Sequence, residues 1–231
     1  LTKPKDEFEL KYEIKEGRKH LEIYQQVKVI LQQTFPRVSV ERYASKDTYY
    51  DNVATLEHWE KGDSIRTRQL LAQDGQCSFK KNAISYKTYK QQGKYNFTIR
   101  KNEERIGETS NIEEYTHFLQ EKGVKTNTLN PIVEVLDYTQ TVTIQVGQTL
   151  VDVQFKISEY KNLNNDKEGT IHAIEIKPRE NQIQDRMALI EVQKLIEERL
   201  PELAQLTTNK SMYGIVIERS KENTKDNEIV I

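Results

Sequence analysis

The sequence predicts an α+β fold in which mostly antiparallel strands, about eight in number, close into a barrel with a polar interior and helices packed outside. Three observations lead to this prediction. Many segments alternate polar and apolar residues with period two, a few repeat apolar residues at helical spacing, and no repeat or low-complexity linker divides the 231 residues. Because this length suits one large domain, we expect a single domain over residues 1–218 and a polar C-terminal tail over residues 219–231.

The strands are expected where alternation is bounded by turn residues. Residues 7–14 alternate without a break, and Gly147 marks the turn between two later strands. A basic stretch that contains tyrosines, residues 80–90, is interpreted as a solvated hairpin, with steering of a phosphate substrate or contact with RNA as the alternatives. The expected strands are residues 7–14, 38–51, 64–71, 94–101, 132–144, 149–160, 170–177 and 213–218.

Three segments show the spacing of amphipathic helices. They are residues 17–34, which Pro36 follows, residues 110–123, which open with a capping box, and residues 182–200, which Pro201 follows. The expected apolar faces are Leu21, Tyr24, Val27 and Leu31 in the first helix, with Ile23 and Ile30 flanking them, Tyr115, Phe118 and Leu119 in the second, and Ile183, Met187, Ile190, Leu195 and Ile196 in the third.

The composition is unusually polar for a folded chain. Charged residues make up 31% and hydrophobic residues 35%, whereas ordinary soluble domains have about 25% charged and roughly 45–50% apolar residues when glycine is counted. Disorder does not explain this, because the net charge is only −1 and 12 tyrosines and 6 phenylalanines are spread along the chain. The balanced charge also argues against a basic nucleic-acid module.

Several classes of protein are excluded by missing motifs. A single cysteine, Cys77, allows neither an internal disulfide nor a paired-cysteine zinc site. The sequence has no Gly-x4-Gly-Lys-Ser/Thr loop, no Gly-x-Gly-x-x-Gly, no His-Glu-x-x-His and no Gly-x-Ser-x-Gly. No apolar run approaches the roughly 20 residues of a membrane span, and no signal-peptide core is visible. We therefore expect a cytoplasmic protein without a membrane or nucleic-acid partner.

Charged residues recur on one face of strand after strand, opposite an apolar face that helices can cover. Taken singly, each strand is typical of a sheet with one solvated face. Taken together, they indicate strands that close on one another, so that the polar faces line an interior and the apolar faces pack outward. The polar-face residues are Glu7, Glu9 and Lys11, then Arg66 and Arg68, then Asn96, Thr98 and Arg100, and finally Glu175 and Lys177.

Such an interior is costly unless its charges are paired or bind a ligand. Carboxylates spaced two residues apart, such as Glu7 and Glu9, suit a hard divalent cation such as Mg²⁺ or Mn²⁺. Converging arginines and lysines suit phosphate oxygens. The two kinds of side chain in one interior predict a metal-bound polyphosphate or nucleoside triphosphate as the small-molecule partner.

In these residues the chain resembles the CYTH superfamily, the triphosphate tunnel metalloenzymes, which include triphosphatases, class IV adenylyl cyclases and a polyphosphate polymerase domain. Its first strand has the Glu-x-Glu-x-Lys signature of that family at Glu7, Glu9 and Lys11. Later segments follow in the family's order and extend the resemblance over residues 7–217. They are Tyr49-Tyr50-Asp51, Ser64-Ile65-Arg66-Thr67-Arg68, Phe97-Thr98-Ile99-Arg100, Ala173-Ile174-Glu175-Ile176 and Lys210-Ser211-Met212-Tyr213.

The resemblance implies a metal-dependent hydrolase of inorganic, nucleoside or thiamine triphosphate, with Mg²⁺ or Mn²⁺ as the cofactor. The implied catalytic residues are Glu9, Lys11 and Arg66, with Glu9 as the group that takes a proton from the attacking water. By position, the implied metal ligands are Glu7, Glu9 and Glu175, and the implied phosphate ligands are Lys11, Arg66, Arg68, Arg100 and Lys210.

Two positions depart from the family pattern. Ala173 stands where the family has the first acid of a late Glu-x-Glu pair. Asp137-Tyr138-Thr139 stands where the family usually has a Lys-x-Arg pair, and Lys156 or Lys177 is the candidate to replace one of the missing charges. The resemblance leaves open nucleotide cyclisation, polyphosphate synthesis and an eroded module that binds polyphosphate or nucleotide without turnover. A helix-covered sheet with solvated charges is the remaining alternative.

Overall fold

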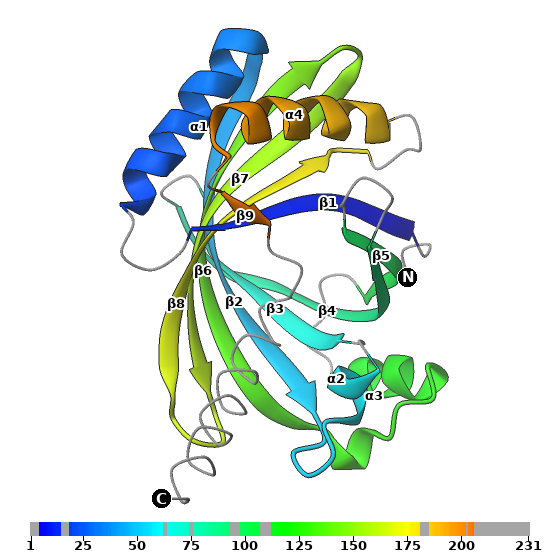
Figure 1. Cartoon of the computed structure of the whole chain (residues 1–231). Coiled ribbons are helices and arrows are strands. Elements are labelled where there is room, and N and C mark those ends of the chain that lie inside the picture. The colour runs from blue at the N-terminus through cyan, green and yellow to red at the C-terminus, as the bar shows by residue number, and fades with distance from the viewer. Residues whose placement is uncertain are drawn as a thin grey trace, which may run out of the picture.

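One sheet of nine strands dominates the part of the chain that the structure describes (Figure 1). This computed structural model describes residues 5–14, 19–61, 64–73, 76–92, 98–106, 112–180, 185–201 and 203–205. For residues 5–7, 59, 72–73, 76–92, 98–106, 112–114 and 204–205 it describes the backbone alone.

Strands and helices together confirm the predicted α+β class. The strands are β1 (Lys5–Ile14), β2 (Arg37–Asp51), β3 (Ser64–Gln73), β4 (Gln76–Gln92), β5 (Thr98–Ile106), β6 (Asn130–Val146), β7 (Thr149–Asn162), β8 (Glu168–Pro178) and β9 (Ala204–Gln205). The helices are α1 (His20–Thr34), α2 (Glu57–Glu60), α3 (Ile112–Glu121) and α4 (Asp185–Arg199), with a 3₁₀ turn η1 (Thr126–Thr128).

Neighbouring strands are antiparallel throughout the described sheet, as the sequence predicted. Their order is β5-β4-β3-β2-β6-β7-β8-β1-β9. The first strand is paired in two halves, since residues 10–14 lie against β8 and residues 5–9 lie against β5. In Figure 1, β1 accordingly starts beside β5 and crosses to the strands that lie beneath α4. β1 thus pairs with β8 and also with β5, the strand at the far end of the order.

The main hydrophobic core lies between the sheet and the helices α1 and α4, which cover one face of β1, β6, β7 and β8 (Figure 1). Leu10, Tyr12 and Ile14 of β1 are buried there, together with Ile174 and Ile176 of β8. Burying one such side chain stabilises the fold by about 1.5–3 kcal/mol. The prediction that helices pack against the apolar face of the sheet is confirmed. No helix in the described ranges is long and apolar enough to cross a membrane.

Two residues of the predicted helix faces were wrong. Leu21 of α1 is 67% exposed and Met187 of α4 is 68% exposed. The buried face of α1 contains Ile23 instead, beside Tyr24, Val27 and Leu31. At about 100° per residue, including Ile23 rotates the centre of this face away from Leu21. The helical period therefore predicted the helix correctly, but it did not determine which of the neighbouring apolar residues face the sheet.

The end of α3 follows the sequence prediction. Gly123 has a positive φ of +75°, and its N–H donates to the carbonyl of Gln120 at 2.9 Å. The next N–H, of Val124, donates to Leu119 at 3.0 Å. This left-handed residue after the last turn is the usual reason for glycine there. The predicted Phe118 and Leu119 pack with Ile65 and Val124 in a smaller core cluster.

Strand β4 runs through residues 80–90 without a turn, so the hairpin expected within this stretch was wrong, whereas the exposure of its side chains lies outside the description. This single long strand pairs with β3 on one side and β5 on the other. Its backbone hydrogen bonds are made within the sheet whatever its side chains, so its lysines gave a misleading signal. The last predicted strand, residues 213–218, and the tail, residues 219–231, lie outside the described residues. The two-residue strand β9 was not predicted.

A ring stack joins α1 to β8. The imidazoles of His20 and His172 are parallel within 10°, with centroids 3.8 Å apart, and His20 meets the Tyr24 ring edge-on. Burial, and then the charge of His20, lower the pKa of His172 below its usual value of 6.5.

This stack predicts a loss of stability in acid. Because the unfolded chain binds the proton of His172 more readily, the contribution of the neutral ring is complete above about pH 6.5 and decreases as the pH falls below it. Urea denaturation of the wild type and His172→Phe at pH 7.5 and 5.5 measures the effect, with the exposed His117→Gln as a control. We expect the wild type to lose more stability than His172→Phe on acidification. Parallel losses would contradict the assignment.

Candidate functional site

The side chains opposite the main core form a second, charged layer on the inner face of the sheet. In β1, the buried Glu9 and Lys11 alternate with the core residues Leu10 and Tyr12, because successive side chains of a strand point to opposite faces. The strand register then places Lys11 opposite Glu175 of β8. The same alternation that builds the core therefore turns these charges inward.

Four of the inward side chains, Glu9, Lys11, Lys156 and Glu175, make up what we call the β1–β8 group. The Lys11 ammonium lies 2.9 Å from Glu175 Oε1 and 3.5 Å from Glu9 Oε1. Lys156 of β7 forms an ion pair with the other oxygen of Glu175, Oε2. Glu175 thus bridges two ammonium groups, and all four residues are at most 5% exposed.

A second set, Asp47, Arg66, Arg68 and Asp137, makes up the β2–β6 group. Arg68 binds Asp47 through two hydrogen bonds, Nε to Oδ1 and Nη2 to Oδ2, both 2.6 Å long. Arg66 Nη1 also donates to Asp47 Oδ2, at 3.2 Å. Asp137 Oδ2 lies 3.8 Å from Arg68 Nη2, and Asp137 Oδ1 accepts a hydrogen bond of 2.5 Å from Ser158. Each of the two groups therefore contains two carboxylates and two basic side chains.

Neighbouring charges raise the pKa of one basic side chain in each group, Lys156 and Arg68. Burial lowers the pKa of Lys156, but the charges of Glu175 and Asp137 outweigh burial and raise it overall. Burial also lowers the pKa of Arg68, whereas Asp47 by charge and hydrogen bonding, and Asp137 by charge, raise it well above its usual value. Asp137 acts on a base of each group, so the two groups form one electrostatic unit.

Helix α1 holds the strands that carry part of this unit. The Tyr24 hydroxyl donates to the carbonyl of Lys156 and lies 3.3 Å from the carbonyl of Ala173. Burial is the main cause that raises the pKa of this hydroxyl, so it stays a neutral donor. The helix thereby links β7 and β8 at the level of Lys156.

The described residues fit a divalent cation only in part. Glu9 and Glu175 converge on the Lys11 ammonium, and Mg²⁺ is often held by one or two carboxylates while phosphate and water complete its shell. Two carboxylates therefore fit such an ion if the Lys11 ammonium gives way. Ala173, opposite Glu13 and Lys156 in the register, adds no ligand. Within the described ranges, no three His, Cys, Asp or Glu side chains gather as a ready-made metal site.

Most of the predicted site residues meet on the inner face. The structure brings four of them together in the β1–β8 group, Glu9, Lys11, Lys156 and Glu175, and two in the β2–β6 group, Arg66 and Arg68. Glu7 and Arg100 are register partners in the β1–β5 pairing, but their side chains lie outside the description. Lys210 lies outside the described residues. Lys177 is half-buried opposite Asp152 and belongs to neither group.

Asp47 is the site residue that sequence reasoning missed. It lies two residues before Tyr49 in β2, so strand alternation places both on one face, and it is 0% exposed. The sequence signal that could have identified Asp47 is this two-residue spacing from Tyr49, the first residue of the Tyr49-Tyr50-Asp51 segment. Asp137 was noticed only as a lost positive charge, whereas the structure places it beside Arg68.

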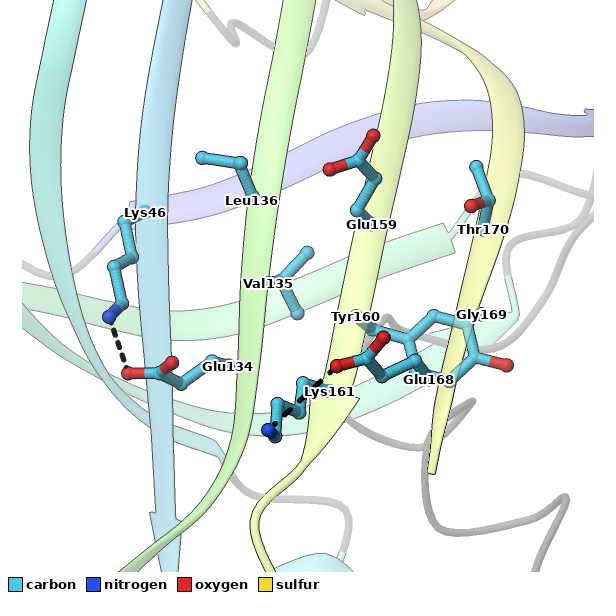
Figure 2. A pocket seen from close by; sticks show the side chains of 10 residues that line it. All are labelled: Lys46, Glu134, Val135, Leu136, Glu159, Tyr160, Lys161, Glu168, Gly169 and Thr170. Carbon is cyan, nitrogen blue, oxygen red and sulfur yellow. Dashed lines mark ion pairs between the residues drawn. The ribbon is translucent and has the colours of Figure 1, made fainter. Parts of the chain in front are cut away.

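A pocket of about 520 Å³ lies on the other face of the sheet, over β2, β6, β7 and β8 (Figure 2). Two ion pairs flank it, Lys46 with Glu134 at 2.6 Å and Lys161 with Glu168 at 3.8 Å. Lys46 and Glu134 alternate along their strands with residues that face inward. The side chains of Lys46 and Glu134 themselves are partly exposed. The pocket is therefore separate from the charged interior.

Several solved structures resemble this protein over most of its length. The chain resembles an adenylyl cyclase candidate from Hippeastrum, described as having a dominant triphosphatase activity, with a TM-score of 0.56 and 12% identity over 91% of this chain and 95% of that one. An adenylate cyclase candidate from Bacillus halodurans matches with a TM-score of 0.52 and 11% identity over 92% and 98% of the two chains. A Pyrococcus horikoshii protein matches with a TM-score of 0.52 and 12% identity over 93% and 99%.

These similarities define the fold of the protein. The chain shares the fold of these solved structures, two of which are adenylyl or adenylate cyclase candidates, in agreement with the fold that its motifs predicted. No family model matches the sequence, and no curated protein matches it either.

Proposed function

We propose that the inner face of this sheet binds the phosphate chain of a triphosphate and hydrolyses it with the help of Mg²⁺ or Mn²⁺. The observation that carries the proposal is that one face of the sheet holds two groups of buried ion pairs. In one group a carboxylate pair shares the Lys11 ammonium, and in the other Arg66 and Arg68 share Asp47. Burying so many charges is costly unless they serve a ligand or one another. Guanidinium groups match phosphate oxygens, and carboxylates match a hard cation.

The proposal includes a closed, eight-stranded tunnel around the two groups. The register between β1 and β5, in which Phe8 lies opposite Ile99 and Glu9 opposite Thr98, supports it. In the same pairing the register places Glu7 opposite Arg100. The enclosed space keeps water out and strengthens each charge interaction with a phosphate chain.

Positioning and charge neutralisation account for most of the catalysis in phosphoryl transfer. Arg66 and Arg68 clamp the phosphoryl oxygens, and Lys11 binds the phosphate chain at the β1–β8 group. Further basic residues supply additional contacts to the phosphate chain. They are Arg100, Lys156, Lys177 and Lys210.

The carboxylates have a separate role in the proposed reaction. Glu7, Glu9 and Glu175 hold the divalent cation, which supplies charge neutralisation and orientation of the phosphate oxygens when it is bound. Glu9, a buried carboxylate of the β1–β8 group, accepts the proton of the attacking water. In the free protein the Lys11 ammonium holds Glu9 and Glu175 together until a ligand arrives.

A second candidate function is phosphate binding without turnover. The observation that favours it is the equal number of acids and bases in the two described groups, where Asp137 takes the place of a basic residue. In that case the interior retains the polyphosphate or nucleotide and releases no product.

The proposed hydrolase is tested by phosphate release from inorganic triphosphate, ATP and thiamine triphosphate, each with Mg²⁺, with Mn²⁺ and with a chelator. We expect release from at least one of these substrates with a metal, loss of release in the chelator, and loss in Glu9→Ala. Tight binding with no release from any substrate would contradict the hydrolase and support the binding module. Cyclic nucleotide from ATP would instead select a cyclase, and chain product from ATP a polymerase.

A further inference from the structure

Asp137 lies in the middle of β6, where the register places Ser45 of β2 on one side and Ser158 of β7 on the other. Its side chain is 1% exposed and both serines are 0% exposed. One carboxylate oxygen accepts the Ser158 hydrogen bond of 2.5 Å, and the other lies 3.8 Å from Arg68 Nη2. The Asp137 carboxylate is thus fixed in position beside Arg68, a side chain proposed to bind phosphate.

The contact with Arg68 differs in kind from that made by Asp47. Asp47 takes two short hydrogen bonds from Arg68 and one from Arg66, so it sets the geometry of both guanidinium groups. At 3.8 Å, Asp137 is beyond hydrogen-bond distance of Arg68 and acts on it by charge. Its charge also reaches Lys156 in the other group.

The charge of the described interior depends on this residue. In the β1–β8 and β2–β6 groups, as far as the structure describes them, carboxylates and basic side chains are equal in number. Without the Asp137 charge, the two groups together would carry one net positive charge. A free triphosphate is a strongly charged anion, and in a buried site of low dielectric one unit charge has a large effect on anion binding.

We propose that Asp137 is a specificity-determining residue of this interior, which lowers its affinity for a free phosphate chain and favours a chain whose charge a divalent cation has already reduced. The inference rests on the proposed function, since it concerns the phosphate ligand of the same site. Through this one carboxylate, the protein discriminates between the free and the cation-bound form of the phosphate ligand.

Asparagine is the substitution that isolates the charge. Asp137→Asn has the same shape, and its amide oxygen can still accept the Ser158 hydrogen bond. Glu134→Gln is the matched control, because it removes the same charge from the same strand but at the partly exposed pair with Lys46 on the other face. A general change in net charge would affect the two variants alike.

The test is calorimetric binding of inorganic tripolyphosphate to the full chain, with excess Mg²⁺ and with a chelator. For the wild type we expect tighter binding with Mg²⁺. For Asp137→Asn we expect the Kd in the chelator to fall about tenfold or more, which corresponds to about 1.4 kcal/mol per factor of ten. Glu134→Gln should stay within about twofold of the wild type, as expected for an exposed charge pair.

Three outcomes would overturn the inference while the proposed function stands. They are equal affinity of the wild type with and without Mg²⁺, unchanged or weaker binding by Asp137→Asn, and the same gain in Glu134→Gln. If neither the wild type nor Asp137→Asn binds tripolyphosphate under any condition while both are folded by circular dichroism, the proposed function fails and the inference fails with it.

Discussion

Replacement of Asp47 by alanine is expected to lower the free energy of unfolding by about 3–5 kcal/mol, the cost of removing one partner from a buried ion pair. Asp47 is 0% exposed and accepts hydrogen bonds from both Arg66 and Arg68. Alanine removes the shared acceptor of two guanidinium groups, and burial prevents water from replacing it fully. Urea denaturation followed by circular dichroism measures the loss.

The design includes a milder variant, because a loss of this size is a large part of a typical stability of 5–15 kcal/mol. Asp47→Asn removes the charge but keeps an acceptor oxygen, so it should lie between Asp47→Ala and the wild type. Glu134→Ala is the control, since its partly exposed pair with Lys46 should contribute only about 0–1 kcal/mol. A loss for Asp47→Ala no greater than that of Glu134→Ala would show that the β2–β6 group does not stabilise the fold.

Replacement of Arg66 by alanine is expected to reduce kcat/KM for triphosphate hydrolysis by about 10²–10³-fold, the usual effect of removing one group that stabilises transition-state charge. Arg66 is suited to this test because Asp47 keeps its two-bond contact with Arg68 when Arg66 is absent. The variant should therefore stay folded while it loses one phosphate ligand. Rates of phosphate release at several substrate concentrations separate kcat from KM.

Two further variants define the origin of that loss. Arg66→Lys keeps the charge but not the planar fork of donors, so it should recover only part of the activity. Lys161→Ala removes a positive charge at the outer pocket, where Lys161 pairs with Glu168, and should leave the rate unchanged. Activity of a folded Arg66→Ala within threefold of the wild type would remove Arg66 from the proposed site.

Short-range patterns account for the parts of the fold that were predicted correctly. The alternation of residues 7–14 identified β1 and separated Glu9 and Lys11 from Leu10 and Tyr12. Gly123 and Gly147 marked a helix end and a hairpin because both positions have positive φ. Strand β4 was missed because its alternation is masked by lysines, and a strand between two neighbours needs no apolar pattern to make its backbone hydrogen bonds.

The orientation of a helix is harder to predict from its period. Leu21 and Ile23 are both apolar, and the spacing of α1 does not decide which of them faces the sheet. The structure buries Ile23 because the helix also docks through Tyr24 on β7 and β8. That contact joins residues more than a hundred positions apart and has no signature in the local sequence.

The sequence by itself determined the α+β class, most of the strands and the inward placement of Glu9, Lys11, Arg66, Arg68 and Glu175, because alternation along a strand is a local property. Only the tertiary structure decided which charges meet. The register of β2 against β3 and β6 brings Asp47 and Asp137 to Arg68 and turns an apparent loss of basic residues into a balanced pair of ion clusters. Pairing between strands depends on contacts over long separations, which no local pattern encodes.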